Sequence, residues 1–388
     1  MNTEKATNLI DMRASNVLLI LNIIRKEPCS RARIAKMTGL SRSAVTIIID
    51  DLLQRGVVEE TGNSKNGTGR KALDLKICAD AAYVIGIHLR SQMYGIGLFN
   101  FDGKLLYSES KDYDENFASA AQLIKVGNDI VTLVGREGIP SEKVLGVGIC
   151  VSGPVDVEAG KVIRPSSIWH EIEIVKIMES ILPWKCFMEN RSNARAVYEK
   201  LYGRCKEFDS FIFFKVDESV GGAIVYKDEV LSGFGKFGNE FGHMSIKHDG
   251  ERCECGNYGC LDLYASIPSI IKQYSQLHMN SWEEVVNAAY DGNAIAIQAV
   301  RQEAEYISTG IVNLCNIFEP EAIALAGDIS YRPSLLLALI GENVSIRHIL
   351  RNVFNSKIIV TEQIDSINLR SAAAIVVEEF YQGKIAFF

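Results

Sequence analysis

A run of eight residues holds three cysteines and two glycines, and it strongly restricts the fold around it. The run is Cys253-Glu254-Cys255-Gly256-Asn257-Tyr258-Gly259-Cys260. Thiolates at such short spacing, with glycines that let the backbone turn back, suit a tetrahedral ion such as zinc. The other six cysteines are scattered singly, as small buried side chains usually are. We therefore expect Cys253, Cys255 and Cys260 to bind a structural Zn²⁺ ion.

A tetrahedral site needs a fourth ligand, and two histidines precede the cluster. His248 is five residues before Cys253, and His243 is ten residues before it. Spacing alone favours His248 and leaves the choice open. A site closed by three thiolates and one imidazole is structural, because it leaves no coordination position for a reactive water.

The net charge of −7 hides an asymmetry along the chain. Residues 1–76 contain 13 Lys and Arg against 8 Asp and Glu, a balance of +5, while the remainder contains 28 against 40, a balance of −12. A basic segment on an acidic body suggests a polyanionic partner for that segment alone. The chain has no apolar run of about 18 residues and no signal sequence at its start, so we expect a cytoplasmic protein without membrane spans.

The basic segment has the pattern of a winged helix-turn-helix. A helix is expected over 15–26, and Ser30 caps a short helix that ends at Gly39. Ser41 caps a third helix that runs to about Arg55. Short strands at 57–60 and 72–77 flank a polar, glycine-rich wing over 62–71. The alternative is an ordinary three-helix packing unit without affinity for DNA.

The second helix of a helix-turn-helix presents its first residues to base edges in the major groove. Cations at the tip of a wing can enter the minor groove, although they are equally often part of a solvated loop. The candidate DNA contacts are Arg31, Ser41, Arg42, Ser43, Ala44 and Thr46 in the helices, and Arg70 and Lys71 in the wing.

The rest of the chain alternates strands and helices, which favours an α/β core. We expect strands at 83–88 and 94–101 that form a hairpin with a turn at Asp102-Gly103. A helix is expected over 118–137, and a buried strand over 144–151. Further expected elements are strands at 210–216 and 322–326, a glycine-rich stretch at 221–242, helices after 264 and a final helix at 369–381.

The stretch from Ser30 to Ser41 resembles the winged-helix head of ROK-family regulators. Gly242-His243, ten residues before the cysteine cluster, matches a second ROK pattern. The resemblance implies that His243 is the fourth zinc ligand. It also implies an actin-like, two-lobed sugar-kinase fold behind the head, and a homodimer or homotetramer that reads a symmetric operator. The implied domains are the winged helix-turn-helix over 1–78, a first lobe over 80–193 plus 369–388, and a second lobe over 194–368 that carries the zinc site and an oligomerisation surface.

The same resemblance implies a sugar pocket. The family motif G-E-x-G-H is similar to Asn239-Glu240-Phe241-Gly242-His243. In the family, this Glu accepts hydrogen bonds from sugar hydroxyls, and the zinc-bound His offers its other ring nitrogen to the sugar. Glu189-Asn190-Arg191-Ser192-Asn193 is similar to E-N-D-A-N, and Asp262 stands where the family has Glu. Trp169 either stacks on a sugar ring or is a plain core aromatic. The implied sugar ligands are Ser152, Gly153, Asn190, Glu240, His243 and Asp262.

The groups that a sugar kinase needs for phosphoryl transfer are replaced. Arg191 stands at the position of the family's catalytic base, and arginine does not accept a proton. The first phosphate loop, D-x-G-G-T in the kinases, is replaced by residues 88–92. The later loops carry carboxylates instead, at Asp217, Glu218 and Asp328, which would repel a triphosphate.

These observations predict a sugar-responsive transcriptional regulator, without enzymatic activity, whose partners are double-stranded operator DNA and a sugar effector. Repression relieved by the sugar is the family's usual mode. Two alternatives stay open. One is an ATP-dependent sugar kinase with a DNA-binding head, and the other is a regulator controlled by a sugar-transport protein.

Overall fold

The computed structural model describes residues 9–61, 73–114, 119–163, 167–231, 239–347, 349 and 356–385. The chain divides into two compact units. Unit 1 comprises 1–150, 172–188 and 372–388, and unit 2 comprises 151–171 and 189–371. Among the described residues, no helix combines the length and the apolarity needed to cross a membrane.

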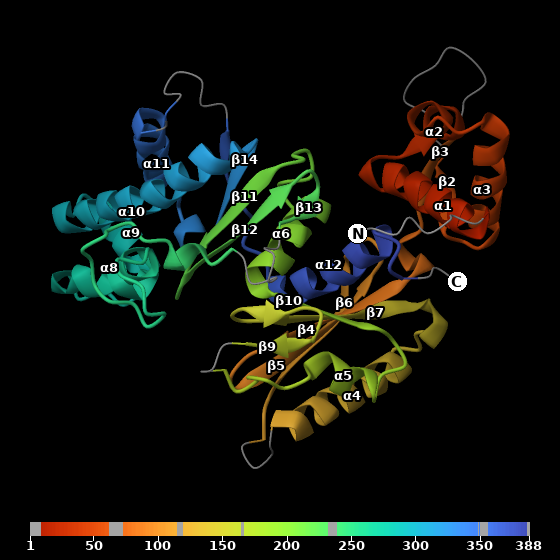
Figure 1. Ribbon diagram of the computed structural model, residues 1–388, viewed down its shortest axis with the longest axis horizontal. Helices are drawn as coiled ribbons and strands as arrows, with labels where there is room; N and C mark the ends of the chain where they lie inside the picture. The colour runs from red at the N-terminus through yellow and green to blue at the C-terminus, as the bar shows by residue number, and fades with distance from the viewer. Residues whose placement is uncertain are drawn as a thin grey trace, which may run out of the picture. The chain divides into compact units, whose positions relative to one another are not determined.

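The N-terminal head of unit 1 is a winged helix (Figure 1). Its elements are α1 (Leu9–Lys26), β1 (Cys29–Ser30), α2 (Arg31–Thr38), α3 (Arg42–Gln54), β2 (Val58–Thr61) and β3 (Asp74–Ile77). The sheet order is β1-β3-β2. Ser30 caps α2, and Gly39 ends it at a φ of 72°. Helix α1 begins earlier than the sequence pattern indicated, and the predicted wing lies outside the described residues.

The rest of unit 1 is built on a five-stranded sheet of order β10-β7-β4-β5-β6. Its elements are η1 (Ala79–Ala81), β4 (Tyr83–Leu89), β5 (Met93–Asn100), β6 (Leu105–Asp112), α4 (Ser119–Arg136), η2 (Ser141–Lys143), β7 (Val144–Val151), α5 (Ile174–Glu179), β10 (Cys186–Asn190) and α12 (Ile367–Tyr381). Figure 1 shows α4 and α5 on one face of this sheet and α12 on the other. A Cβ on Gly148 of β7 would lie 1.8 Å from the carbonyl oxygen of Ala372, so α12 packs against the strand at a glycine.

One predicted connection in this sheet is wrong. Strands β4 and β5 do pair as a hairpin, but they are joined by Arg90, Ser91 and Gln92. The turn at Asp102-Gly103 instead joins β5 to β6, a strand that the sequence pattern did not predict. Along β6 half-buried and exposed side chains alternate, several of them charged, so the strand lacks the apolar signal of its neighbours.

Unit 2 is built on a second five-stranded sheet, of order β13-β12-β11-β14-β15. Its elements are β8 (Val155–Asp156), β9 (Lys161–Val162), α6 (Arg191–Leu201), β11 (Phe211–Val216), β12 (Val220–Tyr226), β13 (Glu229–Val230), η3 (Phe241–His243), α7 (Asp262–Ala265), α8 (Ile267–Gln273), η4 (Ser275–Leu277), α9 (Trp282–Tyr290), α10 (Ala294–Phe318), β14 (Ala322–Gly327), η5 (Asp328–Ser330), α11 (Ser334–Arg347) and β15 (Lys357–Val360). Part of the predicted glycine-rich stretch is therefore strand β12, which pairs antiparallel with β11.

Strand β11 is buried on both faces, and its side chains alternate between two cores. Ile212, Phe214 and Val216 join the large core formed with α7 to α11. Phe211 and Phe213 point to the opposite face and pack with Ala196 of α6. This two-sided burial packs β11 against α6, and the candidate sugar ligands Asn190, Glu240, His243 and Asp262 lie on or beside α6 and β12.

Candidate metal centre, sugar site and DNA-binding surface

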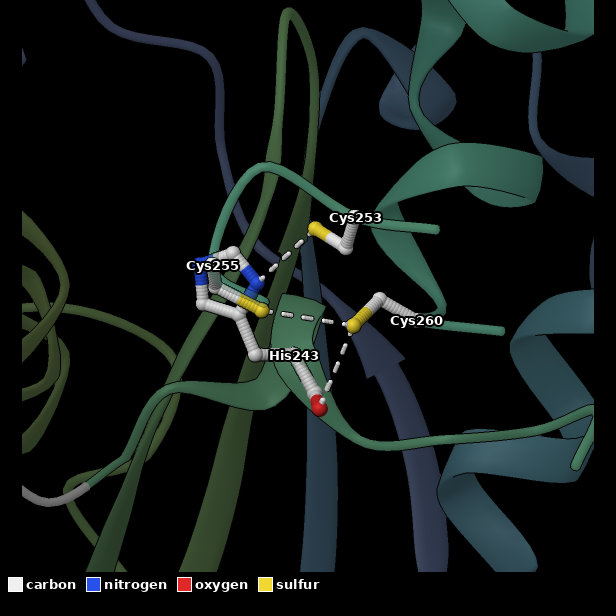
Figure 2. A group of neighbouring side chains, drawn as sticks. All are labelled: His243, Cys253, Cys255 and Cys260. Atoms are coloured by element: carbon white, nitrogen blue, oxygen red, sulfur yellow. Dashed lines mark hydrogen bonds between the residues drawn. The ribbon is translucent and has the colours of Figure 1, made fainter. Parts of the chain in front are cut away.

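The structure brings His243, Cys253, Cys255 and Cys260 together (Figure 2). Their ligand atoms all lie within 4.8 Å of one another. Nδ1 of His243 is 3.7 Å from Sγ of Cys253, and Sγ of Cys255 is 3.7 Å from Sγ of Cys260. Zn–S bonds of about 2.3 Å in a tetrahedron place two sulfur atoms about 3.8 Å apart. The donor set and its spacing therefore fit a Zn²⁺ ion.

The loop that carries the thiols is shaped by hydrogen bonds and by one obligatory glycine. The side-chain amide of Asn257 donates to the carbonyl oxygen of His243 at 3.2 Å, and the backbone carbonyl of Asn257 accepts from the N–H of Cys253 at 2.8 Å. Gly259 has a φ of 63°, and a Cβ there would lie 1.7 Å from the carbonyl oxygen of Lys247. Asn257 was not predicted as a site residue, and its part is visible only in the folded loop.

His248, the alternative fourth ligand, lies outside this cluster, since its side chain is 97% exposed. His243 directs Nδ1 toward the thiols and keeps its other ring nitrogen on the far side of the ring (Figure 2). A metal on Nδ1 would fix the orientation and tautomer of the ring, which leaves Nε2 as a donor for a further ligand.

The first turn of α6 gathers polar side chains that the sequence only partly indicated. Oδ1 of Asn190 caps the helix by accepting from the N–H groups of Ser192 and Asn193, both at 2.9 Å. Oδ1 of the buried Asn193 accepts from the side-chain amide of Asn239 at 3.1 Å, which ties the residue before Glu240 to this turn. Asn239 has a φ of 74°, a conformation that glycine and asparagine adopt most readily. The hydrogen bond from Asn239 to Asn193 was not predicted.

The carboxylate of Asp262 lies beside the turn that carries His243. A Cβ on Gly242 would be 2.6 Å from the carbonyl oxygen of Val220 and 3.3 Å from Oδ1 of Asp262, so a glycine allows η3, β12 and α7 to meet. Oδ1 of Asp262 accepts from the N–H of Val220 at 2.6 Å. Burial raises the pKa of Asp262, against the opposing effects of this hydrogen bond and of His243. Asn190, Glu240, His243 and Asp262 are therefore linked through neighbouring contacts in unit 2.

Ser152, Gly153 and Trp169 belong to the segment of unit 2 between 151 and 171. Ser152 is exposed, and Gly153 has a φ of 95° between β7 and β8. Trp169 is only 3% exposed, so its ring offers little face to a ligand and fits the core alternative. The roles of Ser152 and Gly153 in sugar binding stay predictions.

Charged side chains cluster around Arg191, which the resemblance places at the position of the kinase base. Nη2 of Arg191 lies 3.8 Å from Oδ1 of Asp217, which also accepts from the ammonium of Lys215. Burial and then the charge of Arg191 lower the pKa of Lys215 to about 8. Burial would raise the pKa of Asp217, but Lys215 and Arg191 together hold it below its ordinary value. Lys215 was not predicted as part of this cluster.

The candidate recognition helix α3 presents Arg42, Ser43 and Thr46 to solvent, while Ala44 is half-buried. Oγ of Ser41 accepts from the N–H of Ala44 at 3.2 Å, so Ser41 caps the helix whether or not it also contacts DNA. The predicted wing contacts Arg70 and Lys71 lie outside the described residues.

Two features of the head were not anticipated. Ile47 is 64% exposed on α3, although it is aliphatic. The apolar stripe formed by Val45, Ile48, Ile49 and Leu52 leaves Ile47 on the outer face, and this offset could have identified it as an exposed aliphatic side chain of α3. Arg31 pairs with Asp50 at 2.7 Å and with Glu60 at 3.6 Å, so a contact of Arg31 with DNA would compete with these ion pairs.

Comparisons with known proteins agree with this architecture. Residues 84–379 match the ROK family, and residues 11–67 match the MarR family. The chain is 27% identical to the xylose repressor of Bacillus subtilis over 338 residues, which cover 86% of this chain and 87% of the repressor. It is 23% identical to the DNA-binding transcriptional dual regulator NagC of Escherichia coli over 92% of this chain and 90% of that protein.

Solved structures share the fold. A ROK family transcriptional regulator, a homologue of the Escherichia coli MLC protein, superposes with a TM-score of 0.81 at 24% identity over 96% of this chain and 97% of its own. The ROK hexokinase of Thermus thermophilus superposes with a TM-score of 0.68 at 22% identity, over 78% of this chain and all of its own. The chain combines a winged helix-turn-helix with an actin-like kinase fold, and it belongs to the ROK family.

Proposed function

We propose that this protein is a sugar-responsive repressor whose kinase-like part binds a carbohydrate without phosphorylating it. One observation carries the proposal. The first turn of α6 and the neighbouring η3 turn carry the candidate hydroxyl ligands, whereas Arg191 stands where the resemblance places the base of a kinase. A guanidinium cannot remove a proton from a hydroxyl at neutral pH. The names of the relatives, xylose repressor and NagC, support a regulator of carbohydrate genes.

In this proposal Zn²⁺ is structural. Bound to Cys253, Cys255, Cys260 and His243, it would hold the loop closed and fix the imidazole. His243, Glu240, Asp262 and the amide of Asn190 then offer hydrogen bonds to sugar hydroxyls. Ser152 and Gly153 complete the proposed set.

The head would read operator DNA in the cytoplasm through the start of α3 and the wing, as one half of a homodimer or homotetramer. Sugar lowers operator affinity to the extent that it binds the DNA-free arrangement more tightly than the DNA-bound one. Control by a sugar-transport protein would use the same linkage with a protein in place of the sugar.

The test is operator binding measured by fluorescence anisotropy, on DNA fragments selected by the purified full-length protein. We expect a member of a sugar panel to weaken DNA binding and to raise the melting temperature. A coupled ADP-release assay on the same panel should give no turnover. Sugar-dependent ADP release would establish the kinase alternative, and DNA binding that no sugar alters would refute sugar control.

A further inference from the structure

A pocket of about 580 Å³ lies in unit 2, apart from the candidate sugar ligands. Its walls come from α8, the start of α9 and the η5 turn, with single residues from the turn before β12 and from the segment after β15. Asn190, Glu240, His243 and Asp262 do not line it. A cavity of this size is large enough for a small organic molecule.

The charged side chains of this pocket are mostly acidic. Glu218, Glu283 and Asp328 line it, against a single cation, Lys272. Within the part of the chain that the structure describes, none of these four side chains forms an ion pair. Their charges are therefore available to a ligand.

The neighbouring charged cluster offsets part of this negative charge. Arg191, Lys215 and Asp217 together carry one excess positive charge, and Asp328 lies close enough to Lys215 to offset it. Burial, Asp217 and the glutamate of the preceding turn raise the pKa of Asp328, while Lys215 lowers it. The other two carboxylates of the pocket then face Lys272 alone, which leaves one excess negative charge.

The pocket also has an apolar wall and an indole N–H without a partner. Ile267, Ile271 and Tyr331 supply much of the apolar surface. Trp282 lines the pocket, is 2% exposed, and has no acceptor for its Nε1 among the described residues. Buried polar groups in folded proteins are nearly always hydrogen-bonded, and an unsatisfied one costs stability. This wall therefore suits a ligand with an apolar or aromatic body, whose electron-rich atoms face the indole.

These features together define the charge and the shape of the ligand. A nucleoside triphosphate does not suit the pocket, because Glu218 and Asp328 would repel its phosphates. We propose that the pocket is a second ligand site, which takes a small organic molecule with one protonated amine and an apolar body. The amine lies at Glu218 and Asp328, and the body packs against Ile267 and Ile271. The site does not depend on the proposed sugar binding.

Three probes with one carbon skeleton test the inference by isothermal titration calorimetry on the full-length protein. At neutral pH, 4-phenylbutylamine is a cation, 4-phenylbutanol is uncharged and 4-phenylbutyrate is an anion. We expect the amine to bind at least about fivefold more tightly than the alcohol, and the carboxylate to bind most weakly, because the charged groups lie at a partly exposed rim. ATP is the fourth probe and should not bind.

Substitutions without a change of shape assign the preference to the pocket. Glu218→Gln and Asp328→Asn each remove one charge from an exposed side chain, so the fold should be retained. Each should reduce the preference for the amine over the alcohol, and the double variant should abolish it. Glu342→Gln is the matched control, since Glu342 is exposed on α11 and does not line the pocket. It should keep the full preference.

An alcohol that binds as tightly as the amine, or a failure of all three phenylbutyl probes to bind, would overturn the inference. A preference that survives the double variant, or that Glu342→Gln also abolishes, would refute its assignment to this pocket. ATP that binds more tightly than the amine would identify a nucleotide site instead. In each case the proposed regulator function would stand, because its test measures operator and sugar binding.

Discussion

Replacing Lys215 by methionine should make the stability of the protein respond differently to pH. Lys215 is buried on β11 and contacts Asp217, and burial together with Arg191 lowers its pKa from 10.5 to about 8. The folded chain therefore gives up this proton at a lower pH than the unfolded chain does. Between pH 8 and 10.5 the unfolded state binds more protons, so the contribution of Lys215 to stability rises with pH.

The size of the effect follows from the two pKa values. Each pKa unit corresponds to about 1.4 kcal/mol, so a difference of about 2.5 units amounts to about 3 kcal/mol. Below pH 8 the charged lysine costs the folded state this amount relative to its neutral form, and by pH 10.5 the cost has disappeared. Methionine has no titrating group. The stability of Lys215→Met minus that of the wild type should therefore fall by about 3 kcal/mol across this window.

Urea unfolding followed by tryptophan fluorescence at several pH values from 7.5 to 10.5 measures this difference. Other titrating groups are common to both proteins and cancel in the subtraction. Lys206→Met removes an exposed lysine and should give a flat difference. A flat difference for Lys215→Met as well would refute the argument that Lys215 is held at a lowered pKa by its surroundings.

Three further predictions concern the metal loop and the head. Cys260→Ser should abolish binding of one Zn²⁺ per chain, measured by mass spectrometry of metals, while Cys78→Ser should retain it. Gly259→Ala should also lose the metal, because its Cβ would meet a backbone carbonyl at 1.7 Å, whereas Gly341→Ala on α11 meets nothing within 4 Å and should keep it. Ser41→Ala removes the cap of α3 and should cost about 1 kcal/mol in the thermal unfolding of the head, with weaker operator binding. Normal metal content in Cys260→Ser or Gly259→Ala would contradict the account of the metal loop. An unchanged stability of the head in Ser41→Ala would contradict the account of the cap.

Elements with local signals were predictable from the sequence. The caps Ser30 and Ser41 mark the starts of α2 and α3, and the apolar run from Val144 to Val151 coincides with β7. Strand β6 was missed because charged residues interrupt its apolar positions and its partner β5 supplies the stabilising bonds. The turn at Asp102-Gly103 was recognised as a turn but assigned to the wrong pair of strands, since a turn motif does not tell which strands it joins.

The residues of the candidate site also fall into two groups, those that local spacing predicts and those that only the fold brings together. The thiols of Cys253, Cys255 and Cys260 are close in sequence, so their meeting is a local property that the spacing predicts. Asn193 meets Asn239, and Arg191 meets Asp217, through the packing of α6 against β11 and β12. Contacts of this kind depend on the tertiary fold, and no motif in a single sequence announces them.

The charged cluster of Arg191, Lys215 and Asp217 also fixes the backbone next to a candidate sugar ligand. Asp217 fixes the turn before β12 through the N–H of Ser219, and the next residue, Val220, donates its N–H to Asp262. Asp217, in a segment that resembles a glycine-rich phosphate loop of the family's kinases, therefore has an internal partner for this turn in Lys215. A sensor needs a site whose shape is set before the effector binds. Binding free energy that goes into ordering the site does not contribute to the shift in the DNA-binding equilibrium. If the protein is the non-catalytic sensor proposed above, the charged residues Lys215 and Asp217 thus stabilise the position of a candidate sugar ligand, which favours selection for binding over decay of an enzyme.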